Sequence, residues 1–161
     1  MRRGYDFTRD DLPFLLLQLY FPEITKPESD VIHDFLEAHG TEFSQFSFSV
    51  RVGQGQTPDP THLEGVQRNA VFTSRKRIDL EVWAGAQASL VEVKVRVTPG
   101  VLGQLRTYRQ LWVEEHAGAL EPRLLAIGRY SDEDTLRVLS AEGVDVYLYD
   151  IGVPREGLPA Q

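Results

Sequence analysis

The chain has 161 residues, no cysteine and a net charge of −7, so we expect one domain without disulfides or a cysteine-based zinc site. With 42% hydrophobic and 25% charged residues the composition is that of a globular protein. The longest apolar run, residues 14–17, is far shorter than the ~20 residues of a membrane helix, and no signal segment is recognisable, so we expect a cytoplasmic protein without membrane contact.

The first third of the chain is predicted to contain two helices and a strand. Apolar residues 12–21, with Pro13 in the first turn, predict a short helix that Pro22 and Pro27 end. Ser29 is the expected N-cap of a second helix, which stops at Gly40. Alternating residues 42–52 predict a strand, and the polar residues 53–69 predict a long loop.

The rest of the chain predicts a hairpin followed by alternating helices and strands. The expected elements are strands at 71–83 and 88–97 around Gly85-Ala86, a helix from Thr98-Pro99 to about residue 116, a strand at 124–127, a helix from Ser131 to Gly143 and a strand at 144–149. A strand–helix–strand unit implies parallel pairing, so the expected fold class is α/β with a mixed sheet. We expect one domain over residues 1–150, with 1–27 as a helical extension and 151–161 as a tail.

The charge is unevenly distributed along the chain. Between Arg75 and Arg109 seven basic residues oppose three acidic ones, giving a local charge of +4 against −11 for the remainder. A basic segment in an acidic protein is a candidate docking face for a polyanion, although solvated surface arginines explain the same pattern.

The predicted hairpin brings two acidic residues together. A two-residue turn at Gly85-Ala86 and a four-residue turn around it give the same register, which places Asp79 directly opposite Glu92. Lys94 lies two residues further along on the same face. Two facing carboxylates repel, and a divalent cation such as Mg²⁺ removes that penalty by binding their oxygens. A neighbouring lysine can stabilise negative charge. A purely solvated polar face of the hairpin is the alternative.

These residues carry a resemblance to a known family. Arg77-Ile78-Asp79-Leu80, Val91-Glu92-Val93-Lys94 and Gly103-Gln104-Leu105 with Tyr108 resemble the PD-(D/E)xK nuclease superfamily, in particular the catalytic domain of NucS/EndoMS-type endonucleases, over about residues 28–150. The resemblance implies a restriction-endonuclease-like fold with an αβββαβ core plus a C-terminal αβ unit. It also implies that Asp79, Glu92 and the Val93 carbonyl bind metal, that Lys94 is catalytic and that Gln104 supports the site.

The family often adds an acid from the first helix. Glu28 fits that position better than Glu37, because its spacing places it on the core-facing side of the helix. The chain also departs from the pattern: Ile78 replaces the proline, and we expect residues 53–69 to be an insertion and the dimerising N-terminal domain of the NucS type to be absent. Mismatch specificity is therefore not carried over.

The expected function is a metal-dependent DNA endonuclease or repair-type nuclease that uses Mg²⁺ or Mn²⁺. RNA is the other candidate substrate, and the chain is a candidate homodimer. A catalytically inactive copy of the fold, binding nucleic acid or a protein partner, is the alternative. The four histidines show no metal-binding spacing. The candidate substrate-binding residues are Arg77, Arg96, Arg106, Tyr108 and Arg109.

Overall fold

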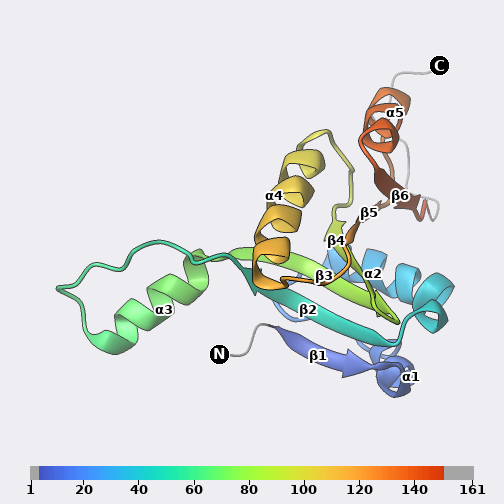
Figure 1. The fold of residues 1–161 in the computed structure, drawn as a ribbon. Coiled ribbons are helices and arrows are strands. Elements are labelled where there is room, and N and C mark those ends of the chain that lie inside the picture. Colours follow the sequence, from blue (N-terminus) through green and yellow to red (C-terminus); the bar gives the residue numbers. More distant parts are fainter. Residues whose placement is uncertain (1–3, 151–161) are drawn as a thin grey trace.

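A single six-stranded sheet organises the computed structural model, which describes residues 4–150 (Figure 1). Its strands follow the chain order, β1-β2-β3-β4-β5-β6. The first four are antiparallel to their neighbours, whereas β4, β5 and β6 run parallel, which confirms the predicted mixed α/β sheet. The strands are β1 (Tyr5–Thr8), β2 (Gln45–Val52), β3 (Lys76–Ala84), β4 (Gln87–Val93), β5 (Arg123–Gly128) and β6 (Val144–Leu148).

Helices cover both faces of this sheet. On one face α2 packs its apolar side, including Val31, Ile32 and Phe35, against β2, β3, β4 and β5. On the other face α4 packs Leu105 and Trp112 against the sheet, and α5 joins the same core beside β6. The parallel pairs require such crossover helices, since their strands enter the sheet from the same end. The helices are α1 (Leu12–Leu15), α2 (Lys26–His39), α3 (Glu64–Ser74), α4 (Gly100–Glu115) and α5 (Glu133–Ala141).

The β3–β4 hairpin has the predicted register. Gly85 has φ +60°, which suits glycine, and the tight turn pairs Ala84 with Gln87. The pairing continues to Leu80 and Val91. Strand β4 ends at Val93, earlier than predicted, because the Val95 carbonyl instead accepts the N–H groups of Arg129 and Tyr130.

The N-terminal prediction is wrong in two respects. Residues 5–8 form strand β1 on β2, and only Leu12–Leu15 are α-helical, so the region is not a helical extension. Helix α2 begins at Lys26, with Pro27 in its first turn, and Ser29 lies inside it rather than capping it. The buried Ser29 hydroxyl accepts the Phe21 N–H, so this serine ties the preceding segment to the helix.

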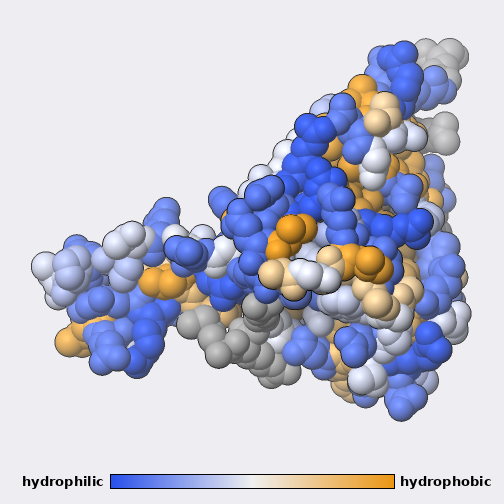
Figure 2. All heavy atoms as spheres, in the orientation of Figure 1, coloured by the Kyte–Doolittle hydropathy of each residue, from blue (hydrophilic) through white to orange (hydrophobic). Residues whose placement is uncertain are grey.

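The predicted loop at 53–69 is confirmed only as far as residue 63, and the predicted start of the next strand at residue 71 is wrong. Helix α3 occupies Glu64–Ser74, and none of its residues is buried. Figure 1 shows α3 projecting from the sheet, and Figure 2 shows that this projection is mostly hydrophilic.

The residues predicted as a tail, 151–161, lie outside the described part of the chain. Within residues 4–150, no helix combines the length and apolar character needed to cross a bilayer.

Candidate active site

Asp79 and Glu92 lie where the β3–β4 ladder opens. Asp79 on β3 is 4% exposed and Glu92 on β4 is 2% exposed. One residue beyond the Leu80 and Val91 pair, Asp79 Oδ2 accepts the Val93 N–H at 3.0 Å. A side-chain carboxylate thus takes the place of a backbone acceptor, which holds Asp79 against the end of β4.

The backbone of Val93 faces the Asp79 side of the hairpin. Lys94 N donates to the Ile127 carbonyl on β5, so the peptide groups of the preceding residue face β3 instead. The N–H and C=O of one extended residue point to the same side of the strand. Since the Val93 N–H reaches Asp79, the Val93 carbonyl is directed to this side of the hairpin as well.

Glu92 is partnered on one oxygen only. Its Oε1 accepts Gln104 Nε2 from α4 at 2.9 Å and lies 3.2 Å from Lys94 Nζ. Its Oε2 is buried and has no hydrogen-bond partner among the described residues. Burial, followed by the charge of Asp79, raises the pKa of Glu92 to about 7. The pocket therefore disfavours the charged carboxylate, which a cation at the bare oxygen would stabilise.

The other ionisable groups respond to the same negative charge. Burial raises the pKa of Asp79, although the Val93 N–H, Arg77 and Lys94 oppose that shift. Burial lowers the pKa of Lys94, but the carboxylates of Glu92, Asp79 and Glu28 outweigh it and raise the pKa overall. Lys94 is thus a cation at neutral pH, and with its side chain 38% exposed it lies at the opening of the buried pair.

Only one of the two candidate helix acids approaches the site. Glu28, in the first turn of α2, raises the pKa values of both Asp79 and Lys94 by its charge, and its Oε2 accepts the Thr25 hydroxyl at 3.0 Å. Glu37 lies further along α2, 71% exposed, with His33 as its neighbour. The structure therefore brings Glu28 near the acidic pair and leaves Glu37 outside it.

The candidate substrate-binding residues are less uniform. Arg77 donates to Asp79, while Arg106 pairs with Glu142 and Arg109 lies 3.5 Å from Glu121. Hydrogen bonds from the Thr135 N–H and hydroxyl are the main cause of the lowered pKa of Asp132, and the charge of the exposed Arg96 lowers that pKa further.

Tyr108 is buried rather than displayed on the surface. Burial, with Glu92 and Asp79, raises its pKa. Its hydroxyl is near enough to Glu92 to lower the pKa of that residue, so its placement is that of a supporting side chain.

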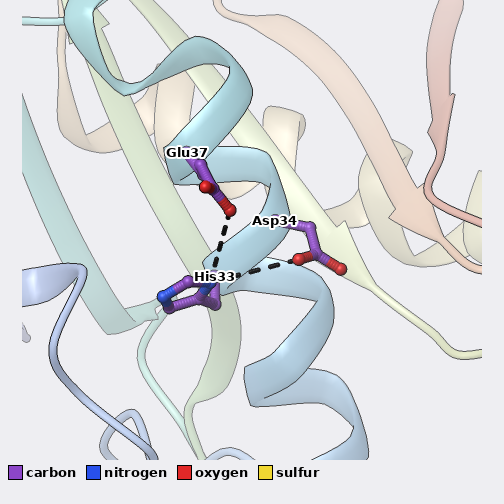
Figure 3. Close-up of side chains that lie close together, drawn as sticks. All are labelled: His33, Asp34 and Glu37. Atoms are coloured by element: carbon purple, nitrogen blue, oxygen red, sulfur yellow. Dashed lines mark ion pairs between the residues drawn. The ribbon is translucent and has the colours of Figure 1, made fainter. Parts of the chain in front are cut away.

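A second cluster on α2 was missed at the sequence level. His33 Nδ1 lies 4.0 Å from both Asp34 Oδ1 and Glu37 Oε2 (Figure 3). Within residues 4–150 these are the three His and acidic side chains whose ligand atoms converge within 4.8 Å. Their i, i+1 and i+4 positions were the available signal. Arg129 already pairs with the Asp34 carboxylate, however, which lowers the attraction of this cluster for a cation.

We compared the chain with protein-family models, with curated proteins and with solved structures, and none of them matches.

Proposed function

We propose that this protein is a metal-dependent nuclease that hydrolyses phosphodiester bonds in DNA, with RNA as the other candidate substrate. The observation that carries the proposal is the buried pair Asp79 and Glu92, one of whose oxygens has no partner, with Lys94 at its opening. Buried acids without full compensation are costly, and such groups cluster at functional sites.

The donor set suits a hard divalent cation. Asp79, Glu92 and the Val93 carbonyl offer oxygen atoms, which Mg²⁺ and Mn²⁺ prefer, and Glu28 adds negative charge nearby. When all three are ionised, the side chains of Asp79, Glu92 and Glu28 carry three negative charges against the two positive charges of Lys94 and Arg77. The net negative site favours a cation, which in such enzymes supplies charge stabilisation at the phosphate.

The protein residues then have separate roles. Gln104 holds Glu92 by its amide, and Tyr108 lies beside the same carboxylate. Lys94, being partly exposed and protonated, is placed to stabilise negative charge on a phosphate that approaches the opening. Arg96, Arg106 and Arg109 are the proposed contacts to the nucleic-acid backbone, where arginine binds phosphate in a bidentate manner.

The proposal includes a restriction-endonuclease-like core, since the observed helix, strand hairpin and crossover helix carry the acidic pair in the order expected for it. A cytoplasmic location fits a chain without cysteine. We also propose that the protein forms a homodimer, because cutting both strands of a DNA duplex requires two active sites.

Cleavage of plasmid DNA and of labelled DNA and RNA oligonucleotides tests the proposal. Wild-type protein should cut in Mg²⁺ or Mn²⁺ and not in EDTA, and Lys94→Ala should lose about 10²-fold or more of the rate. Lys26→Ala is the matched control, because Lys26 pairs with Asp30 outside the site. Equal rates for wild type and Lys94→Ala would contradict the proposal, and DNA binding without any cleavage would favour the inactive module.

A further inference from the structure

Asp79 and Glu92 differ in how the protein satisfies them. Glu92 Oε2 has no hydrogen-bond partner among the described residues, but both oxygens of Asp79 are engaged. Asp79 Oδ2 accepts the Val93 N–H at 3.0 Å, and Oδ1 accepts Arg77 Nη2 at 3.3 Å. A cation that approaches the pair therefore meets one bare oxygen on Glu92 and, on Asp79, an oxygen that already faces a guanidinium.

Arg77 is held in this position from its other side. Its Nη1 donates to the Glu23 carbonyl at 2.7 Å, so the guanidinium bridges the Asp79 carboxylate and the segment before α2. The side chain is 32% exposed, which leaves room for it to move without unpacking the core.

The segment that anchors Arg77, residues Pro22 and Glu23, is itself bound to strand β2. Ser49 stands opposite Asp79 between the paired positions of β2 and β3, and its hydroxyl donates to the Pro22 carbonyl at 2.5 Å. The Glu23 carboxylate binds Arg51 at 2.6 Å. Both Glu23 and Ser49 have positive φ values, +60° and +53°, which non-glycine residues adopt only where surrounding contacts hold them. The strained backbone thus lies immediately around the Asp79 anchor.

We propose that Arg77 is the resident counter-ion of Asp79 and competes with the divalent cation for this carboxylate. The inference rests on the metal centre of the proposed function and adds a positioning residue to it. In the metal-free protein Arg77 neutralises the buried Asp79, and the Pro22–Glu23 segment keeps the guanidinium close to it. This segment and Arg77 together therefore determine how strongly the site binds metal.

Calorimetric titration with Mn²⁺ in the absence of nucleic acid, at pH 8.5, tests this competition. Arg77→Met removes a positive charge next to the bound cation, so it should tighten Mn²⁺ binding by about tenfold or more. Arg77→Lys keeps the charge and should remain within about threefold of wild type. Arg137→Met makes the same change at a surface ion pair and should leave the affinity unchanged. The background for the titration is His33→Ala, which removes the histidine from the second cluster on α2.

Two failures are distinguishable. If the wild-type protein does not bind Mn²⁺, or if Asp79→Asn binds Mn²⁺ as well as the wild type does, the proposed metal centre itself fails. If that binding exists but Arg77→Met binds Mn²⁺ equally or more weakly, the metal centre stands and the competition is refuted.

A measurement on the wild-type chain covers the case in which Arg77→Met does not fold. The Nε–H resonance of Arg77 should shift on addition of Mg²⁺, and it should not shift in Asp79→Asn. An unchanged Arg77 resonance at saturating Mg²⁺ would overturn the inference.

Discussion

Three influences act on the Glu92 side chain, and the hairpin register reveals only one of them, the facing Asp79. Glu92 is buried, it faces Asp79, and it shares a single oxygen between Gln104 and Lys94. Lys94 and the Tyr108 hydroxyl lower its pKa, but burial and Asp79 dominate, and the pKa is about 7. At neutral pH the residue is therefore near its midpoint, where a bound cation decides its charge.

The stability of the metal-free protein should depend on pH through Glu92. An acid whose folded-state pKa is raised does not destabilise the protein at pH values below its ordinary pKa of 4.5. The destabilisation grows as the pH rises from 4.5 and is complete above about pH 7. Glu92→Gln carries no ionisable group, so in EDTA it should gain stability relative to wild type between pH 4.5 and pH 8, by up to about 3 kcal/mol. Urea denaturation at the two pH values measures this gain. An unchanged difference between the two proteins would show that Glu92 ionises freely.

Among the elements, β5 determines how the end of β4 is placed. Gly128 lies so close to β4 that a Cβ atom there would stand 2.4 Å from the Lys94 carbonyl and 2.7 Å from Val97 Cγ2. Parallel pairing of β4 with β5 brings these backbones together, and only glycine fits without displacing them. The backbone of the proposed catalytic lysine is thus positioned by a strand that contributes no candidate site side chain.

Gly128→Ala should therefore destabilise the protein by about 1–3 kcal/mol, because a backbone carbonyl has to move. It should also reduce cleavage, since the displaced carbonyl belongs to Lys94. Gly65→Ala on α3 is the control, because nothing lies within 4 Å of its added Cβ, and it should be neutral or slightly stabilising. Denaturation curves of the three proteins provide the comparison. Wild-type stability in Gly128→Ala would contradict this role of β5.

The elements also show what local sequence patterns can predict. The β3–β4 hairpin was predicted with its register, because the turn and the alternation of apolar residues specify it together. Helix α3 was missed because Gly53, Gly55, Pro58 and Pro60 shortly precede it and no buried stripe marks the helix. Strand β1 was missed because it is short and depends on pairing with β2, far along the chain.

On the scale of the whole molecule, the same limit applies to the site. The approach of Asp79, Glu92 and Lys94 follows from the hairpin register, so the sequence predicts it. The Glu23 anchor of Arg77 depends on a distant segment with an unusual backbone conformation, which no local pattern indicates. The same is true of the Arg129 partner of Asp34.

The charge distribution is also modified by folding. The segment from Arg75 to Arg109 carries +4 in the sequence, but acidic residues outside it pair with part of that charge. Arg106 pairs with Glu142, and Arg109 lies near Glu121. The basic face that would meet a nucleic-acid backbone is therefore weaker than the sequence count indicates, and phosphate has to displace these acids to bind.

The central claim is that the Asp79 and Glu92 pair is a divalent-cation centre, and thermal unfolding with and without Mg²⁺ tests it most directly. Mg²⁺ at ten times its Kd should stabilise the wild-type protein by about 1.4 kcal/mol, following RT ln(1 + [Mg²⁺]/Kd). Asp79→Asn removes one charged ligand at nearly constant shape, so its melting temperature should barely respond to Mg²⁺. A wild-type melting temperature that is the same in Mg²⁺ and in EDTA, or an equal Mg²⁺ response in Asp79→Asn, would contradict the claim.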